Sequence, residues 1–340
     1  MRESLGFFKW SIAATVLALV AAFLYDGLTA LAIVAVLIAL EASISFDNAV
    51  VNAQVLKRMS DFWRKMFLTV GVVIAVFGMR LVFPILIVAV ATGIAVPDVV
   101  DQALNDKAKY AENVEKAAPL IGAFGGAFLL MVALGFLFKT DEHEDFWITP
   151  VERPLSKLGR IPGLRIPVTA VAVGITALLV GSEDRSDVLL AGGLAIVANL
   201  LVRALAKALG ARTEDGEKAA GAAGFALFLY LELLDASFSL DGVLGAFAIS
   251  TDIVVIALGL GVGALYIRSL TVYMVDRDSL THYRYISNGA GWAILFLAVI
   301  LFVSTKAHPP EWLTGLVGIG VIGAAFASSV RQNRREGAPA

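Results

Sequence analysis

An eight-residue pattern rich in carboxylates and hydroxyls occurs twice in the chain. The copies read Glu41-Ala42-Ser43-Ile44-Ser45-Phe46-Asp47-Asn48 and Asp235-Ala236-Ser237-Phe238-Ser239-Leu240-Asp241-Gly242. Both lie within long apolar segments, where an ionised side chain at the centre of a bilayer costs roughly 3 kcal/mol. Their four carboxylates therefore need protons, cationic partners or a hydrated cavity, and this need points to a functional site.

The chemistry of the two copies predicts a site for a divalent metal cation. Carboxylates, hydroxyls and carboxamides are hard oxygen ligands, which suit Mg²⁺, Ca²⁺ and Mn²⁺. The chain has no Cys and neither motif segment contains His, so thiolate and imidazole ligands are excluded there. The predicted ligands are Glu41, Asp47, Asp235 and Asp241, with Asn48, Ser45, Ser239 and Glu232 as additional ligands and Arg80 and Arg268 as counter-ions.

The spacing of the two carboxylates within each copy limits how they can share an ion. On an intact helix Glu41 and Asp47 would lie about 9 Å apart along the axis and point in different directions. Either the helix breaks near Asp47–Asn48 and near Asp241–Gly242, or the protein has more than one site. The alternation of polar and apolar residues and the glycine favour a local break, which membrane helices tolerate where they line a cavity.

The composition indicates an all-α polytopic membrane protein. Of the 340 residues, 59% are hydrophobic and 16% are charged, and the mean hydropathy is +0.82. A soluble domain carries about 25% charged residues, and several apolar runs here reach the roughly 18 residues that indicate a membrane span. The net charge of −2 gives no reason to expect nucleic-acid binding. The expected partners are therefore the lipid bilayer and a divalent metal ion, and the oligomeric state stays open.

About ten transmembrane helices are predicted from the apolar runs. Their approximate ranges are 8–25, 28–52, 66–93, 118–138, 166–181, 188–209, 219–249, 252–275, 287–304 and 312–329. The connections near 57–65, 139–165, 203–218 and 276–286 and the C-terminal tail are basic, whereas those near 94–117, 182–187 and 305–311 are acidic or poor in charge. By the positive-inside rule these connections alternate without conflict if both termini are cytoplasmic. The prediction is a multi-pass protein of the inner (plasma) membrane.

The two copies of the motif then run in opposite directions across the membrane. An odd number of spans separates them, which predicts two inverted five-helix repeats, residues 1–181 and 182–340, within one membrane domain. Inverted repeats are typical of secondary transporters, whose substrate sites lie near the bilayer midplane. Glu41 and Asp235 fall near the centres of their helices, and we expect them to form the central site.

With these residues in place, the chain resembles the TerC family of bacterial membrane proteins, which is associated with tellurium resistance and metal homeostasis. The resemblance rests on Glu41 with Phe46-Asp47-Asn48 in the first half and on residues 235–241 in the second. The resemblance covers about residues 30–300. Within the family, the chain resembles the longer, ten-helix type. The resemblance implies export of Mn²⁺ or a related cation, with the acidic motif residues of the family at Glu41, Asp47, Asp235 and Asp241.

These observations predict a secondary transporter that exports a divalent cation by proton- or potential-driven alternating access. No Walker A motif or other nucleotide loop occurs, so ATP drive within this chain is not expected. We expect neither enzyme activity nor a resident cofactor, and the preference for Mn²⁺ rests on the resemblance alone. Two alternatives stay open: a non-transporting scaffold in a membrane stress or tellurium-resistance complex, and an intramembrane aspartyl enzyme with two aspartates that share a proton.

Overall fold

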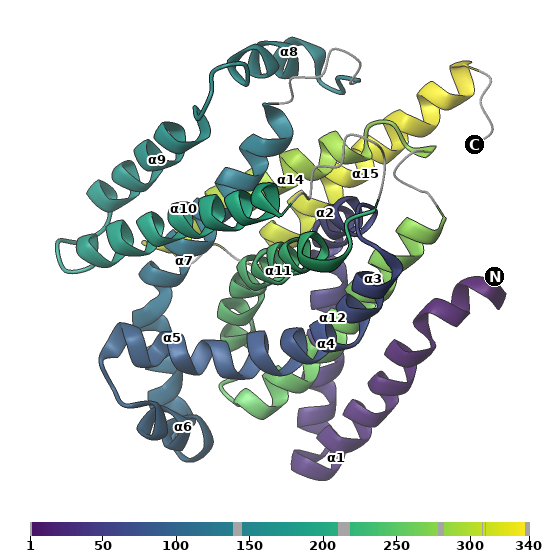
Figure 1. Cartoon of the computed structure of the whole chain (residues 1–340). Coiled ribbons are helices and arrows are strands. Elements are labelled where there is room, and N and C mark those ends of the chain that lie inside the picture. Colours follow the sequence, from purple (N-terminus) through teal and green to yellow (C-terminus); the bar gives the residue numbers. More distant parts are fainter. Residues whose placement is uncertain are drawn as a thin grey trace.

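The regular structure of the protein is helical throughout its described part. The computed structural model describes residues 2–138, 145–209, 218–277, 282–307, 309 and 311–336. Within these ranges a few side chains, including that of Asp241, are not described. Eight of the described segments are long and apolar enough to cross a membrane. This confirms the predicted all-α polytopic membrane class (Figure 1).

The first apolar helix is bent back on itself. α1 (Arg2–Ile44) contains two residues with non-helical backbone, Asp26 and Gly27, and Gly27 has a φ of 66°. Only glycine adopts this conformation without strain. The two arms of α1 lie side by side in Figure 1 and share a cluster of buried alanine and valine side chains that includes Ala22 and Val34. The bend falls where the sequence predicts one span to end and the next to begin.

The segment that follows is helical but irregular. It consists of α2 (Phe46–Leu56), α3 (Asp61–Leu68), α4 (Val70–Val73), the π-helix η1 (Ile74–Val82) and α5 (Phe83–Thr92). Residues Asp61–Thr92 together have the length and apolar character of a membrane span. The span begins before the predicted residue 66, with Asp61 in the first turn, where a negative charge complements the helix dipole.

Two connections that were predicted to be loops contain helices. α6 (Val96–Asn105) lies in the 94–117 connection and α8 (Thr149–Leu158) in the 139–165 connection. Each has a proline in its first turn, where the missing N–H is not needed. α7 (Lys107–Leu137) also begins well before the predicted residue 118, because the side chain of Asp106 accepts a hydrogen bond from the backbone N–H of Lys109 and caps the helix.

The first half of the chain ends with the short helix α9 (Arg165–Leu179). The second half supplies the remaining long helices of the described part, which are α10 (Arg185–Ala208), α11 (Gly221–Ile249), α12 (Ile253–Asp276), α14 (Ile286–Ser304) and α15 (Glu311–Glu336). α9 has 15 residues and is the shorter apolar helix beside the eight long ones. α7 packs against α10, α11 and α14 near the centre of the bundle, and its apolar stretch is mostly buried.

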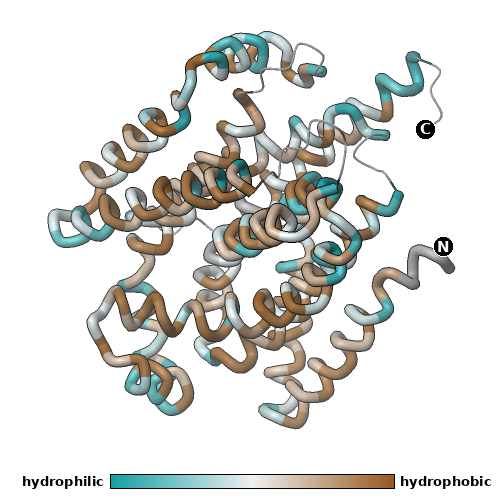
Figure 2. The backbone as a smooth tube through the Cα atoms, in the orientation of Figure 1, coloured by the Kyte–Doolittle hydropathy of each residue, from teal (hydrophilic) through white to brown (hydrophobic). Residues whose placement is uncertain are grey.

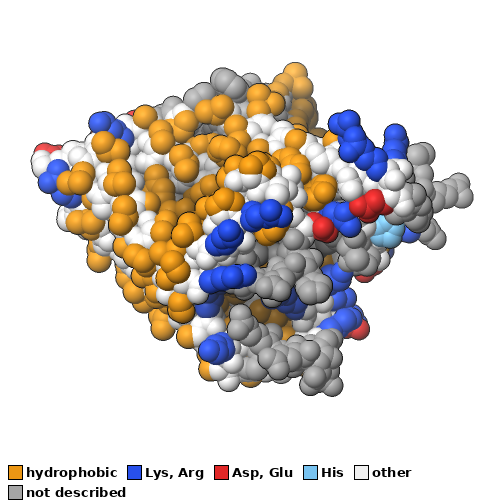
Figure 3. All heavy atoms as spheres, turned by 90° about the horizontal axis from the view of Figure 1, so that it is seen from above, with side chains coloured by type: hydrophobic (Ala, Val, Ile, Leu, Met, Phe, Trp, Pro, Cys, Tyr) orange, Lys and Arg blue, Asp and Glu red, His pale blue; other side chains and the backbone are white. Residues whose placement is uncertain are grey.

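The outer surface of the bundle is largely apolar. Leu17 of α1, Leu178 of α9 and Leu201 of α10 are each at least 64% exposed. Figure 2 shows hydrophobic residues along the lengths of the helices and hydrophilic residues near their ends. In the view from above, apolar side chains cover much of the visible face, and Lys and Arg side chains gather toward the right (Figure 3). This distribution fits a surface in contact with lipid.

The two halves of the chain are joined by short polar contacts between α2–α3 and the start of α11. The backbone N–H of Ser60 donates to the Ala219 carbonyl (2.9 Å), and the N–H of Ala219 donates to the Arg58 carbonyl (2.8 Å). The Trp63 indole N–H donates to the carbonyl of Gly221 (3.0 Å). Both marked chain ends lie at the right of the molecule in Figure 1.

Candidate functional site

The helical backbone is interrupted in the first motif segment and continuous in the second. The first is interrupted at Ser45 (φ −85°, ψ 24°), where α1 ends and α2 begins. The interruption lies two residues before the predicted break at Asp47. In the second copy α11 continues through Asp241–Gly242, so the predicted break there is wrong. Since a helical glycine still satisfies the backbone hydrogen-bond pattern, Gly242 alone does not end the helix.

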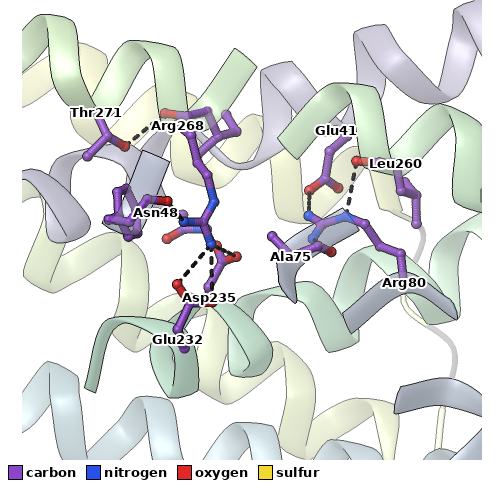
Figure 4. A network of polar contacts seen from close by, with 11 residues as sticks. Glu41, Asn48, Ala75, Arg80, Glu232, Asp235, Leu260, Arg268 and Thr271 are labelled. Atoms are coloured by element: carbon purple, nitrogen blue, oxygen red, sulfur yellow. Dashed lines mark hydrogen bonds and ion pairs between the residues drawn. The ribbon is translucent and has the colours of Figure 1, made fainter. Parts of the chain in front are cut away.

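Glu41 is held by a buried arginine. Its Oε1 accepts a hydrogen bond from Nη2 of Arg80 (2.7 Å), and Glu41 and Arg80 are 4% and 3% exposed. Arg80 Nε donates to the carbonyl of Leu260 on α12 (3.0 Å), and Nη1 donates to the carbonyl of Ala75 (2.8 Å). The guanidinium group therefore binds one carboxylate and two backbone carbonyls, as Figure 4 shows.

The π-helix η1 provides both Arg80 and one of its acceptors. In a π-helix the backbone bonds are formed between residues five apart, which widens the turn and displaces side chains from their α-helical positions. Arg80 and Ala75 are separated by this interval. π-helical segments occur frequently at functional sites, and η1, with nine residues, places the guanidinium group between α1 and α12.

A second buried arginine, Arg268 of α12, binds two carboxylates on α11. Its Nη2 lies 3.3 Å from both carboxylate oxygens of Glu232 and 3.2 Å from Oδ2 of Asp235. Nη1 donates to the carbonyl of Phe67 (2.6 Å), and the guanidinium group lies 4.1 Å from the centroid of the Phe67 ring. All three charged side chains are at most 6% exposed, and Figure 4 shows them converging.

The first motif also reaches the second directly. Nδ2 of Asn48 on α2 donates to Oδ1 of Asp235 (2.9 Å). In the reverse direction, a Cβ atom added to Gly242 would lie 2.8 Å from Oε2 of Glu41. Asn48 and Gly242 occupy the same position in the two copies, and each lies beside the first carboxylate of the other copy. The glycine therefore makes room for the Glu41 carboxylate.

A small cavity lies between the motif segments. Its volume is about 20 Å³, which is enough for roughly one water-sized occupant. Glu41, Ser45 and Asp47 line it from the first copy, and Phe238 and Gly242 line it from the second. Apolar residues of α14 and α15 close the remaining sides. The arrangement brings Glu41 and Asp47 to one cavity although they are separated along the chain.

The other predicted ligands occupy different places. Asp235 and Glu232 lie in the Arg268 cluster, and the hydroxyl of Ser239 is buried without a hydrogen-bond partner. The side chain of Asp241 lies outside the described residues. Among the described side chains, no group of three or more His, Cys, Asp or Glu residues is arranged to hold a metal ion. In this conformation the guanidinium groups, rather than a shared set of carboxylates, surround the acidic side chains.

Two features of the interior were given no role from the sequence. Asn52 on α2 is completely buried, and neither Nδ2 nor Oδ1 has a hydrogen-bond partner. Its place on the same helix face as Ser45 and Asn48 was the available signal. Glu152 of α8 is 3% exposed and accepts hydrogen bonds from Asn288 Nδ2 and Trp292 Nε1, both at 2.8 Å. No signal in the sequence connected α8 with α14.

The fold and the site define an all-α polytopic membrane protein with ion-paired carboxylates buried between its helices. Over residues 46–336 the chain matches the family described as "Protein of unknown function (DUF475)", and it belongs to that family. No curated protein and no solved structure matches the chain. The family description assigns no activity, so the resemblance to the TerC family stays a prediction.

Proposed function

We propose that this protein is a secondary transporter that exports a divalent metal cation through the cavity between its two motif segments. The observation that carries the proposal is this cavity with Glu41 and Asp47 on its wall. Carboxylate and hydroxyl oxygens suit Mg²⁺, Ca²⁺ and Mn²⁺. We propose Mn²⁺ as the favoured ion, and this choice rests on the resemblance to the TerC family.

The charges around the cavity support a divalent cation as the substrate. Among the described side chains, Glu41 and Asp47 line the cavity, and the buried carboxylates of Glu232 and Asp235 lie in the neighbouring Arg268 cluster, so four buried carboxylates face the two guanidinium groups of Arg80 and Arg268. With all of them ionised, the cluster carries an excess of two negative charges. One divalent cation, or two protons in its absence, would neutralise this excess in a medium where net charge is costly.

The contacts of the two motifs support an inverted-repeat architecture with ten crossings. Arg80 pairs with Glu41 and reaches a carbonyl of α12, whereas Arg268 pairs with Asp235 and reaches a carbonyl of α3. Residues 1–181 thus make toward residues 182–340 the same kind of contact that they receive from them. The positions of Asn48 and Gly242 beside the first carboxylate of the other copy follow the same pattern. Ten crossings require that both arms of α1 and the short α9 each span the bilayer, and we place both termini in the cytoplasm.

The two arginines have a defined part in the proposed cycle. In the absence of the cation they neutralise Glu41 and Asp235 at 2.7 Å and 3.2 Å. A cation that binds Glu41 in the cavity replaces the guanidinium group of Arg80 as its counter-charge, and the bonds of Arg80 to the other half of the chain can then exchange. Protons or the membrane potential supply the energy, and the two halves move relative to each other around the site.

A second candidate function is a non-transporting membrane scaffold, and a specific observation favours it. The arginines satisfy Glu41, Glu232 and Asp235 without any metal, and the described side chains form no three-ligand group. Buried ion pairs of this kind also occur as structural elements that fix helix positions. Transport measurements distinguish the two functions.

The test is ion flux into proteoliposomes, with Mn²⁺, Ca²⁺ and Mg²⁺ offered separately under an imposed pH gradient. We expect gradient-driven Mn²⁺ flux for the wild type and at least about tenfold less for Glu41→Gln, because a buried ligand is removed. Glu112→Gln makes the same chemical change at an exposed site and should retain flux. Thermal unfolding in detergent establishes that each variant is folded. Absence of flux for all three ions in folded wild-type protein would support the scaffold instead.

A further inference from the structure

A polar face of α2 continues beyond the cavity toward the α2–α3 connection. Ser45, Asn48 and Asn52 follow one another at helical spacings of three and four, so they lie on one side of the helix. Ser45 lines the cavity, and Asn52 lies about 6 Å further along the helix axis than Asn48. Both asparagines are buried, at 4% and 0% exposure. The face therefore continues from the cavity through the interior of the bundle toward the α2–α3 connection.

The carboxamides on this face have unsatisfied polar atoms. Asn48 donates Nδ2 to Asp235, but its Oδ1 has no partner. Asn52 has no partner for either Oδ1 or Nδ2. Two other buried asparagines differ, since Nδ2 of Asn113 donates to Gln102 and Nδ2 of Asn288 donates to Glu152, whereas Asn199 of α10 also has an unsatisfied Nδ2. Each unsatisfied buried polar group costs about 1–3 kcal/mol, so the sequence retains an unfavourable feature at Asn52.

The chemistry of the unsatisfied atoms is that of a weak cation subsite. Amide carbonyl oxygens are neutral hard ligands for divalent cations, and they bind more weakly than carboxylates do. An anion is disfavoured because the buried carboxylates of Asp47 and Asp235 belong to the same part of the protein. Transport requires sites from which the ion can also leave, and a neutral site next to an acidic one meets this need.

We propose that Asn48 and Asn52 form a second subsite for a partly hydrated divalent cation, between the acidic cavity and the α2–α3 end of the protein. The inference rests on the proposed transport function and adds a place on the ion's path. Oδ1 of each asparagine faces the cation or its water, and Nδ2 of Asn52 donates to a water of hydration. Because the α2–α3 connection is basic and is expected to be cytoplasmic, this subsite receives the ion before the acidic cavity does.

The decisive variant is Asn52→Leu, which preserves the approximate shape of the side chain and removes both polar atoms. We expect it to unfold in detergent at a temperature at least as high as the wild type, because an unsatisfied buried pair is replaced by apolar groups. We expect the initial rate of Mn²⁺ flux at subsaturating Mn²⁺ to fall about tenfold. A purely structural residue would not combine retained stability with lost flux.

Asn199→Leu is the control. Asn199 of α10 is also completely buried with an unsatisfied Nδ2, but it lies outside the two motif segments, and its Oδ1 accepts a hydrogen bond from Nε of Arg203 (2.7 Å). We expect this variant to be less stable than the wild type, because that hydrogen bond is lost, but to keep the wild-type rate. If Asn52→Leu does not fold, Asn52→Ser, which retains one oxygen, replaces it and should give an intermediate rate.

The outcomes separate this inference from the function on which it rests. Wild-type flux with unchanged rate and KM for Mn²⁺ in Asn52→Leu would overturn the subsite and leave the transporter intact, with a structural water as the partner of Asn52. Absence of wild-type flux would overturn both. Asn52→Asp adds a carboxylate at the subsite and should lower the KM for Mn²⁺ together with the maximal rate, because release becomes slower.

Discussion

At the scale of single residues, Arg80 and Arg268 each bind a carboxylate of their own half of the chain and a backbone carbonyl of the other half. The carbonyl acceptors are those of Leu260 and Phe67. Removal of one member of a buried ion pair typically costs about 3–5 kcal/mol, because the other charge is left uncompensated. The arginines therefore stabilise both the site and the packing of the two halves. The transport cycle proposed above would have to exchange these bonds without exposing the charges to the bilayer.

Gly242 provides a test of the site that does not remove a charge. In Gly242→Ala the new Cβ would lie 2.8 Å from Oε2 of Glu41, so the end of the glutamate side chain must move. We expect stability to be retained, because alanine favours the helix by about 1 kcal/mol. We expect Mn²⁺ flux in proteoliposomes to fall severalfold, because the carboxylate is displaced and the cavity becomes smaller.

The control for this variant is Gly193→Ala in α10, where an added Cβ would meet no atom within 4 Å. It should gain up to about 1 kcal/mol of stability and leave flux unchanged. If Gly242→Ala transports at the wild-type rate, the position of the Glu41 carboxylate is not important for transport.

At the scale of elements, the sequence predicted the apolar helices and the polar motif residues but not their detailed geometry. Composition and apolar runs are local properties, so the helical membrane class followed from them. The interruption at Ser45 and the π-helix around Arg80 depend on packing between helices that are distant in sequence. The same is true of α8, which is held by the contact of Glu152 with Asn288. Which arginine pairs with which carboxylate could likewise not be read from spacing.

The start of α12 gives a prediction for pH dependence. Asp252 caps this helix by accepting a hydrogen bond from the N–H of Val254 (2.9 Å), and it also binds Lys107 of α7. Partial burial raises the pKa of Asp252, but the hydrogen bonds from Lys107 and Val254 outweigh this effect and hold the pKa below its ordinary value. The charged form of Asp252 therefore stabilises the contact between α7 and α12.

Because the folded-state pKa is lowered, this stabilisation is fully present above the unfolded value of about 3.9 and is lost as the pH falls through the lower folded value. Asp252→Asn keeps a capping oxygen but removes the charge. We expect it to melt below the wild type at pH 7 and 5, with the difference shrinking below about pH 4. Thermal unfolding of both proteins across this pH range measures the effect, and a difference that does not depend on pH would contradict it.

At the scale of the whole molecule, the number of crossings depends on α9. Its 15 residues extend about 22 Å, against a hydrocarbon core of about 30 Å. A crossing by α9 therefore requires local thinning of the bilayer or help from the flanking residues. With that crossing the two motif segments are related by inversion and both termini lie on one side. Without it, the second half of the chain has the opposite orientation to the one proposed.

The chain has no native cysteine, so single-cysteine variants report sidedness without background. Lys157→Cys in α8 and Glu183→Cys after α9 lie at exposed positions on either side of this helix. We expect a membrane-impermeant maleimide to label Glu183→Cys in intact cells and Lys157→Cys only after permeabilisation. Lys57→Cys and Lys306→Cys, at other exposed positions, should behave as internal and external references respectively. Labelling of positions 157 and 183 under the same conditions would mean that α9 does not cross, and the inverted five-helix repeats would then be wrong.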